Sequence, residues 1–556
     1  MFPLISTTYD AEKRIWFGPK RKDLYSENAT LGEVICNQLR KQPNRIIQIH
    51  DQTGEAMTCG ELYRNAQILT RQLVKLNLNA GDIVGLYAAN STHVVTVMLA
   101  SFLCGCPVNP VYAEFDKESV SALYSVTRPK ILFCDVENYE NTRRVNEELN
   151  LNCKIFVLNG HLEGVANVKE LLEWNEELDE NFSYPCFDLN GDDTALIVFS
   201  SGTTGPAKGV LCSHLAFLNQ ENAPNLTTDS VLFGFSPMYW ISGVWALTTS
   251  LMNSCCRIIT EKSFTTAYFL DLVEKHKITH VIMNASHLAE VALLEDVTKA
   301  QEKMKSIVAF WAGGSVMPTI VHERMERMIP NARERPGFMA AYGMSELAGL
   351  VSMNGTIPKQ RCASSVGQLV SNRIVRIIDD KGMPLGPNEL GQICIQLNQY
   401  SWKGYFKNEV ATKRALVDNW LHTGDMGHFD SQGFLHFCSR GNDVFKSRNF
   451  QIYPQILEGL IAKVPGVFDV CVVGVPNILA TNLTAAAVVR TADEEGQRLT
   501  AKDIDDHVKA NIAEMYNLHG GVYFFEALPK TATGKMLRKT IMDMVVKRSK
   551  EENAVN

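Results

Sequence analysis

The chain has 556 residues, of which 46% are apolar and 21% are charged, and its formal net charge at pH 7 is −7. This length predicts two or more domains, and the composition is that of a globular chain, which excludes a largely disordered one. The weakly acidic balance argues against a nucleic-acid partner held by bulk electrostatics, so any anionic ligand must be bound locally.

The fourteen cysteines include no C-x-x-C pair, and neighbours such as Cys104 and Cys106 stand in apolar runs. This usage favours reduced, buried thiols in a cytosol-like compartment. The N-terminus lacks an apolar signal core, and the C-terminus, residues 554–556, lacks a peroxisomal address of the S-K-L type. We therefore expect a cytoplasmic location, with a peroxisomal one as the alternative, and leave the oligomeric state open.

The first part of the chain alternates between helical and strand patterns. Alternation at this spacing predicts a parallel sheet covered by helices on both faces. No residue of this scaffold has an obvious chemical role. The expected elements are helices at 31–39, 59–76, 94–104 and 117–124, with strands between 45 and 57, at 83–88 and at 131–134.

A run of small and hydroxylated residues, S-S-G-T-T-G-P-A-K, follows an apolar strand pattern at 195–199. Glycines let backbone N–H groups approach an anion, hydroxyls add donors, and the closing lysine adds positive charge. A Walker loop is excluded because Gly209 follows the lysine. The run predicts phosphate binding, with a flexible surface hairpin as the alternative. Its candidate ligands are Ser200, Ser201, Gly202, Thr203, Thr204, Gly205 and Lys208.

The full pattern resembles the signature of the adenylate-forming superfamily of acyl-CoA synthetases, aryl-CoA ligases and beetle luciferases. The resemblance implies an α/β fold, with a large N-terminal domain of parallel and mixed sheets layered with helices and a small mobile α+β C-terminal domain. It also implies binding of ATP with Mg²⁺, joining of AMP to a carboxylic acid, and transfer of the acyl group to CoA. Thr204 is then a catalytic candidate.

Residues 231–256 contain no charged side chain and are long enough to span a bilayer. Pro237 and several hydroxyl residues argue against a span, so we expect a buried strand, a turn and a helix lining an interior cavity. Relatives often carry a histidine or aromatic residue at Trp240, against the acyl pocket. Trp240 is therefore expected to shape that pocket, together with Gly313 and Met344; an ordinary core tryptophan is the alternative. Trp245 and Trp311 are further candidates for the same cavity.

Two small-residue segments resemble the nucleotide-binding turns of the superfamily. The first, Gly313-Gly314-Ser315, follows a predicted strand at 307–312 and is expected beside the ribose and adenine. The second resembles Y-G-x-[ST]-E, in which the tyrosine stacks on adenine, the serine donates to the α-phosphate and the glutamate holds Mg²⁺. A hydrolase elbow is excluded because Leu347 stands where its second glycine belongs. The second segment comprises Ala341, Tyr342, Gly343, Met344, Ser345 and Glu346.

Two further motifs follow in the order of the superfamily. W-L-H-T-G-D ends in Asp425, whose carboxylate can accept from both ribose hydroxyls. Arg440 follows a predicted strand at 434–438 and matches the family arginine that also reaches the ribose. Solvent exposure is the better interpretation for any one charged loop residue, but the joint spacing favours binding.

The composition changes after Arg440, so the domains are expected to be 1–439 and 440–556. The second part shows helix patterns at 455–461 and 504–512 and strand patterns at 470–475, 485–489 and 522–525. It ends in P-K-T-A-T-G-K, and the resemblance implies that Lys535 swings in to the reacting carboxylate and α-phosphate. Lys535 is the strongest catalytic candidate.

The chain departs from the superfamily near the hinge. Asn442 stands where relatives have Lys or Asp, and K-S-R-N-F-Q replaces the K-Y-K-G-F-Q of 4-coumarate-CoA ligase-like chains. Lys446 keeps the first lysine, Arg448 replaces the second, and Asn449 replaces a glycine that contacts pantetheine in relatives. These changes support adenylation more firmly than thioester formation.

The leading hypothesis is an acid–thiol ligase that activates an apolar fatty or aryl acid with ATP and transfers it to CoA, releasing pyrophosphate and AMP. Two alternatives stay open: an adenylate-forming enzyme without CoA transfer, as in a luciferase, and a non-catalytic nucleotide-binding relative. The predicted partners are the acid, ATP and CoA, with no nucleic acid and no transmembrane segment.

Overall fold

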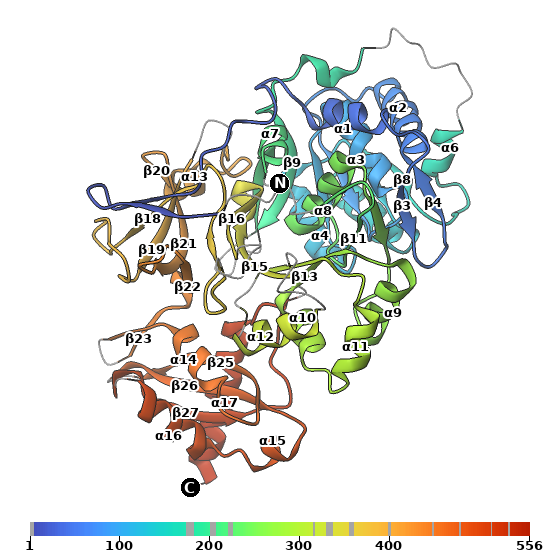
Figure 1. Cartoon of the computed structure of the whole chain (residues 1–556). Helices are drawn as coiled ribbons and strands as arrows, with labels where there is room; N and C mark the ends of the chain where they lie inside the picture. Colours follow the sequence, from blue (N-terminus) through green and yellow to red (C-terminus); the bar gives the residue numbers. More distant parts are fainter. Residues whose placement is uncertain are drawn as a thin grey trace.

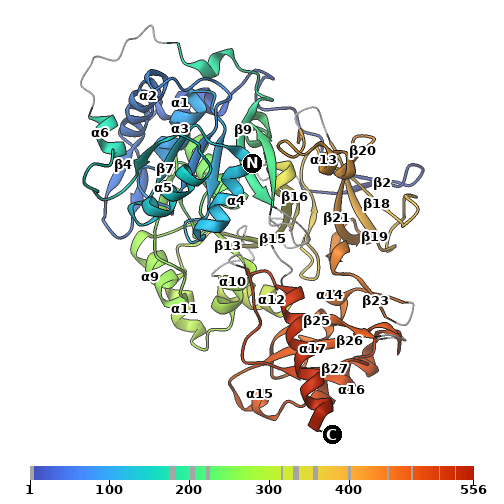
Figure 2. The same cartoon turned by 180° about the vertical axis from the view of Figure 1, so that it is seen from behind.

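The computed structural model places most of the chain in five sheets with surrounding helices (Figure 1). Three sheets belong to the part before residue 441, and two smaller ones belong to the part after it. Figure 2 shows the later residues, coloured orange to red, as a group of their own below the rest. The described residues are 5–173, 183–200, 207–220, 226–314, 317, 319–329, 337–354, 361–397, 402–447, 450–477, 480–512, 514–531 and 534–555.

The first sheet has six strands in the order β10-β9-β6-β5-β7-β8. All its neighbours pair in parallel except β9 and β10, which form an antiparallel hairpin. This confirms the parallel sheet that the alternating patterns predict. Its strands and the helices near it are α1 (Leu31–Leu39), α2 (Cys59–Lys75), β5 (Val84–Tyr87), α3 (Val94–Leu103), β6 (Val108–Val111), α4 (Lys117–Thr127), β7 (Ile131–Cys134), α5 (Tyr139–Glu148), β8 (Lys154–Val157), α6 (Val168–Leu172), β9 (Thr194–Ser200), β10 (Lys208–Ser213) and α7 (His214–Leu218).

Local sequence signals explain these helices. Helix α2 begins at a capping box, in which the Thr58 hydroxyl accepts from the Glu61 backbone N–H and the Glu61 carboxylate accepts from the Thr58 N–H. Helix α3 is apolar on every side and is buried along its whole length, packed against α1 and α2. The apolar pattern of α3 therefore marks the centre of the large core.

The second sheet has nine strands in the order β17-β16-β15-β14-β13-β11-β12-β3-β4. Its central strands, from β3 to β15, are parallel, so their carboxyl ends lie at one edge. Its strands and the helices that follow them are β3 (Ile46–His50), β4 (Ala56–Thr58), β11 (Val231–Gly234), α8 (Ile241–Asn253), β12 (Cys256–Ile259), α9 (Thr266–His276), β13 (His280–Asn284), α10 (Ala285–Ala292), α11 (Val297–Lys303), β14 (Ala309–Gly313), α12 (Thr319–Met328), β15 (Gly337–Met344), β16 (Gly349–Met353) and β17 (Gln368–Leu369).

The uncharged segment 231–256 folds as a strand, β11, and a helix, α8, as the sequence predicts. Helix α8 has 13 residues, nine of them buried. In the part of the chain that the structure describes, no helix combines the length and the apolar character needed to cross a membrane.

The third sheet has seven antiparallel strands and joins the N-terminus to the region before the hinge. Trp16 anchors this junction, because its ring stacks on Phe429 at 4.5 Å between centroids. The elements of the third sheet are β1 (Thr8–Asp10), β2 (Ile15–Phe17), β18 (Ile374–Ile378), β19 (Gly391–Gln396), α13 (Glu409–Ala415), β20 (Leu416–Val417), β21 (Trp420–Phe429) and β22 (Leu435–Arg440).

The C-terminal part has its own core, which includes Leu457, Val472, Val488 and Ile504. The five predicted elements are present, at 454–461, 467–477, 481–490, 501–511 and 521–524, whereas the long helix Arg538–Val555 was not predicted. The boundary at 439/440 stays a prediction. The elements are β23 (Phe445–Ser447), β24 (Phe450–Ile452), α14 (Pro454–Ile461), β25 (Val467–Asn477), β26 (Thr481–Arg490), α15 (Glu494–Arg498), α16 (Ala501–Asn511), β27 (Gly521–Phe524) and α17 (Arg538–Val555).

Candidate active site

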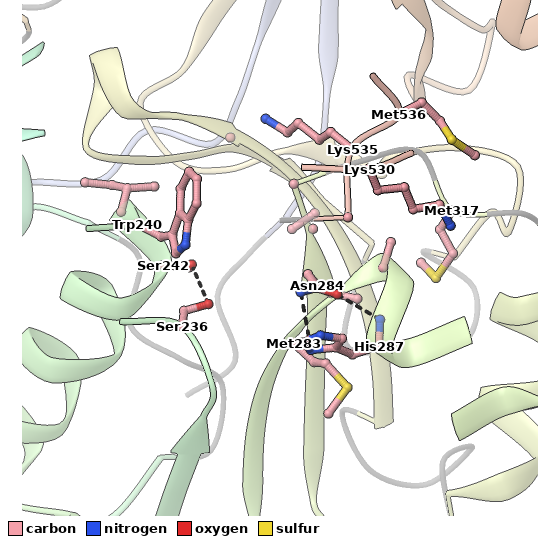
Figure 3. A pocket seen from close by; sticks show the side chains of 18 of the residues that line it. Ser236, Trp240, Ser242, Met283, Asn284, His287, Met317, Lys530, Lys535 and Met536 are labelled. Atoms are coloured by element: carbon pink, nitrogen blue, oxygen red, sulfur yellow. Dashed lines mark hydrogen bonds between the residues drawn. The ribbon is translucent and has the colours of Figure 1, made fainter. Parts of the chain in front are cut away.

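A cavity of about 2280 Å³ lies between the large part and the C-terminal part. The carboxyl ends of β13, β14 and β15 open onto it, as is usual for ligand sites in parallel sheets. The third sheet contributes Asp425 and Arg440, and the C-terminal part contributes Lys535. Figure 3 shows Trp240, Asn284 and Lys535 reaching the same space from three different parts of the fold.

The two ends of the predicted phosphate loop flank this cavity. Ser200 ends β9, Lys208 begins β10, and the two residues face each other in the hairpin register. Both line the cavity, and Lys208 Nζ lies 5.0 Å from the centroid of the Tyr405 ring. The remaining loop candidates lie outside the described residues: Ser201, Gly202, Thr203, Thr204 and Gly205.

Tyr342, Asp425 and Arg440 form one polar group, in which Tyr342 and Asp425 are buried and the Arg440 side chain is 41% exposed. The Tyr342 hydroxyl donates to Asp425 Oδ2 at 2.6 Å, and Arg440 Nε lies 3.7 Å from Asp425 Oδ1. Strands β21 and β22 place Asp425 and Arg440 directly opposite each other. Burial raises the pKa of Asp425, and the Arg440 charge opposes that shift. Burial and the Asp425 charge hold the pKa of Tyr342 well above its usual value, so this hydroxyl stays a donor.

Glu346 is held by a hydroxyl that the sequence patterns did not reveal. It lies in the short turn Ser345–Leu347 after β15, and its Oε1 accepts from Tyr405 Oη at 2.9 Å. Burial raises the pKa of Tyr405, and Glu346 adds to this rise. Ser345, Met344 and Ala341 also line the cavity. Among the described residues, the Glu346 carboxylate has one hydrogen bond, the bond from Tyr405 Oη to Oε1.

Glycines at the ends of β14 and β15 keep the backbone close to the cavity. A Cβ on Gly313 would lie 2.9 Å from the Ala341 carbonyl oxygen, and one on Gly343 would lie 2.5 Å from the Gly349 carbonyl oxygen. Gly314 has a φ of +90°, which disfavours any side chain. Close strand packing therefore requires glycine at 313 and 343, while the predicted role of this turn beside the nucleotide ring stays a prediction; Ser315 lies outside the described residues.

Lys535 enters the cavity from the C-terminal part (Figure 3). Its backbone carbonyl accepts from the Thr531 N–H at 2.8 Å, and its own N–H donates to Thr531 Oγ1 at 3.1 Å, so a tight turn presents the side chain. Burial, and next the Arg440 charge, lower the pKa of Lys535 to about 8, while Asp425 and Glu346 oppose the shift. The structure therefore has the lysine facing the predicted nucleotide site.

The aromatic candidates for the acyl pocket lie together. Trp240, Trp245 and Trp311 all line the cavity, and the Trp245 and Trp311 rings meet edge to face at 5.9 Å. Trp240 contacts Tyr239 at 4.5 Å between ring centroids and directly precedes α8, without a capping hydrogen bond from its side chain. The lining is not purely apolar, because Ser236 and His287 share it (Figure 3).

The hinge candidates are only partly described. Asn442 lies in the short helix Gly441–Asp443, directly after β22, and Lys446 lies in β23; their side chains, and all of Arg448 and Asn449, lie outside the described residues. Their predicted roles remain untested.

Sequence reasoning missed three groups around the cavity. Tyr405 holds Glu346, the Asn284–His287 pair lines the cavity, and Arg538 anchors the start of α17 close to Lys535. Tyr405 and Arg538 find their partners 59 and 80 residues away, which no local pattern encodes.

Comparison with known proteins gives consistent matches. Residues 36–406 match the family model described as AMP-binding enzyme, and residues 457–535 match the one described as AMP-binding enzyme C-terminal domain. A curated relative, 4-coumarate–CoA ligase 3 of Oryza sativa subsp. japonica, is 28% identical over 546 residues, covering 96% of this chain and 95% of its own.

Solved structures share the fold over nearly the whole chain. ATP-bound MatB from Rhodopseudomonas palustris has a TM-score of 0.82 at 21% identity, covering 94% of this chain and 100% of its own. The anthranilate CoA ligase AuaEII, in complex with anthranoyl-AMP, has a TM-score of 0.83 at 18% identity, covering 94% and 99% respectively. These likenesses extend across both the large and the C-terminal parts.

Proposed function

The chain belongs to the family of AMP-binding enzymes, and on this premise we propose that it is an AMP-forming acid–thiol ligase. It activates a carboxylic acid with ATP and transfers the acyl group to coenzyme A. One observation carries the proposal: five charged residues far apart in the sequence line one cavity, namely Lys208, Glu346, Asp425, Arg440 and Lys535. The names of its relatives, which are acid–CoA ligases, support the same reaction class.

The nucleotide lies along the carboxyl ends of β14 and β15 in this proposal. Asp425 and Arg440 bind the ribose, since one carboxylate can accept from two neighbouring hydroxyls. The Tyr342 ring and the glycine turn at the end of β14 hold the adenine. Lys208 and Ser345 contact the phosphates, together with the loop that contains Thr204.

Glu346 fits a magnesium ion. Mg²⁺ takes oxygen ligands and is commonly held by one or two carboxylates plus substrate phosphates. Tyr405 occupies Oε1 of Glu346, so Oε2 is the oxygen that would hold the ion. The bound ion would neutralise phosphate charge.

In the first half-reaction a carboxylate oxygen of the acid attacks the α-phosphorus of ATP. The bond from the α-phosphorus to the bridging oxygen breaks, and pyrophosphate leaves with the electron pair. The acid is already a nucleophile, so the protein contributes mainly positioning and charge. Protonated Lys535 offsets the negative charge that grows on the phosphoryl oxygens.

In the second half-reaction the sulfur of CoA attacks the acyl carbon. The bond between that carbon and the phosphate oxygen breaks, AMP leaves, and the thiol proton passes to solvent. We place the domain boundary at 439/440 and the hinge at Asn442, because β22 ends at Arg440 and the following strands form their own sheets. Rotation there withdraws Lys535 and admits the thiol.

The acid contacts Trp240, Met344 and the Gly313 turn, on the side of the cavity opposite the ribose residues. A cytoplasmic location stays part of the proposal, and it is supported by the fourteen cysteines, all of which are free thiols.

A panel of carboxylic acids tests the function, with AMP formation measured with and without CoA. A ligase forms AMP and acyl-CoA together only when an acid, MgATP and CoA are all present. AMP formation at the same rate with and without CoA would favour a luciferase-like adenylating enzyme. If no acid supports exchange of labelled pyrophosphate into ATP, the chain is a nucleotide-binding relative without this activity.

A further inference from the structure

One wall of the cavity carries a neutral histidine whose free hydrogen-bonding group is set by its neighbours. His287 lies in the first turn of α10, and Asn284 is the residue that caps this helix. Both line the cavity, and Figure 3 shows them on the wall across from Trp240. The nucleotide and phosphate contacts proposed above use neither residue.

Asn284 determines where the His287 ring carries its proton. Asn284 Oδ1 accepts from the His287 backbone N–H at 2.8 Å, so the Asn284 amide nitrogen is directed to His287 Nδ1, at 3.3 Å. An NH₂ group only donates, so Nδ1 is the acceptor. The proton of the neutral ring is therefore on Nε2, and Nε2–H has no partner among the described residues.

Aromatic rings hold this donor in one orientation. Phe264 stacks on the imidazole at 4.0 Å with 8° between the planes, and Phe235 meets it edge-on at 6.0 Å. Burial lowers the pKa of His287 to about 4, so the ring is uncharged at neutral pH. A rigid, neutral N–H donor in a largely apolar wall is a specificity element, because an apolar ligand there would leave the donor unpaired.

The charges nearby narrow the class of group that suits this donor. Glu290 lies three residues after His287, on the same face of α10, and also lines the cavity. A second carboxylate on the ligand would therefore face a like charge. Lys530, on the facing C-terminal part, is paired with Asp469 at 2.6 Å. Burial raises the pKa of Glu290, and the Lys530 charge opposes this rise because it favours the ionised form. The wall therefore favours a neutral oxygen over an anionic one.

We infer that His287 selects an acid that carries a neutral acceptor oxygen, a hydroxyl, carbonyl or ether, on an otherwise apolar body and away from its carboxylate. This inference rests on the proposed function and refines it, since the uncharged sequence of 231–256 alone favours a plain fatty or aryl acid. Asn284 is a positioning residue, because it acts through the ring of His287.

Matched acids test the selection. Octanoic acid is compared with its 4-, 6- and 8-hydroxy and 7-oxo forms, and cinnamic acid with its ring-hydroxylated forms, by acid-dependent pyrophosphate exchange. In the wild-type protein at least one oxygenated acid should exceed its parent in kcat/KM by about 10- to 100-fold. His287→Phe keeps the stacking and loses the donor, so this ratio should fall to about 1.

Two further variants separate recognition from folding. His287→Gln keeps an N–H donor and should restore part of the preference. Asn284→Ser keeps a helix-capping side chain but loses the amide donor, so the ratio should fall while the melting temperature holds. The inference would be overturned if the preference stayed unchanged in His287→Phe. It would also be overturned if the wild-type protein converted the parent acids with the same kcat/KM as every oxygenated form.

A spectroscopic measurement tests the donor without any turnover. Long-range ¹H–¹⁵N correlation of the full-length protein, with the His287 signal assigned by its loss in His287→Phe, should show the Nε2-protonated tautomer at pH 7. The Nδ1 tautomer or the imidazolium would overturn the assignment. If this tautomer is present but no acid supports exchange, the ring is as described, and both the proposed function and the substrate selection built on it are wrong.

Discussion

Arg538 and Glu458 form a two-point ion pair inside the C-terminal part, with Nη1–Oε1 at 2.5 Å and Nη2–Oε2 at 2.8 Å. Arg538 Nη1 also donates to the Val472 carbonyl at 2.9 Å, and Nε lies 3.3 Å from Asp443 in the hinge segment. Arg538 begins α17, three residues after Lys535. One guanidinium therefore joins helix α14, strand β25 and the hinge to the turn that presents the lysine.

Removing this guanidinium should destabilise the C-terminal part. Arg538→Gln leaves Glu458 buried without its partner, so we expect a loss of about 3–5 kcal/mol in the free energy of unfolding. Urea denaturation monitored by backbone circular dichroism measures this free energy. Arg498→Gln is the matched control, because its pair with Glu494 is fully open to solvent, with side chains 80% and 81% exposed. Equal small losses in both variants would contradict the role of Arg538.

Lys535→Ala should separate the two half-reactions. Pyrophosphate exchange should fall by at least about 10²- to 10³-fold, the scale of one lost transition-state donor. Attack of CoA on supplied acyl-adenylate should stay near the wild-type rate, because Lys535 has then withdrawn. Lys530→Ala is the control, since that lysine is paired with Asp469. Parallel loss of both half-reactions in Lys535→Ala would argue against the exchange of faces at the hinge.

The pH dependence of the first half-reaction should follow Lys535. Burial and Arg440 lower the pKa of this lysine to about 8, and only the protonated form offsets phosphoryl charge. The kcat/KM of exchange should therefore decline as pH rises through about 8, by about tenfold per unit. Arg440→Gln removes a charge that repels protonated Lys535, so the decline should move to higher pH. This shift is expected even if the substitution also lowers the maximal kcat/KM. A profile that stays flat to pH 10 would exclude this assignment.

Tyr342→Phe should weaken nucleotide binding. The substitution keeps the ring but removes the 2.6 Å hydrogen bond to Asp425, which then loses a partner in a buried setting. The cost should be about 1–3 kcal/mol, or about 5- to 150-fold in the Kd for ATP. Isothermal titration with ATP measures it. Phe437→Leu, beside the same ring at 5.8 Å, alters packing only, and an equal effect there would indicate that the hydroxyl contributes nothing specific.

Much of the fold follows from local pattern. The helix at 31–39 and the strand at 131–134 have the predicted bounds: the helix buries residues at helical spacing, and the strand is a short apolar run that is buried at every position. The third sheet was not predicted, since it pairs β2 with β18 across more than 350 residues, and short strands at such separation have no local signature. The division of the chain near 440 remains a prediction.

In the candidate site, too, some residues could be identified from the sequence and others could not. Glu346, Asp425, Arg440 and Lys535 lie in short motifs of fixed spacing, so the sequence identifies each of them, and they do line one cavity. Tyr405 stands in no such motif, and its importance becomes visible only through the Glu346 oxygen that it contacts. Most of the phosphate loop and part of the hinge lie beyond the described residues, so their predicted roles stay predictions.

The ladder between β21 and β22 keeps Asp425 and Arg440 opposite each other on the large part. Both strands belong to the third sheet, and β22 ends at Arg440. A change at Arg440 therefore reaches both the proposed ribose contact and the pKa of Lys535, so capture of the nucleotide and the rate of the first half-reaction share one residue and cannot be tuned separately there.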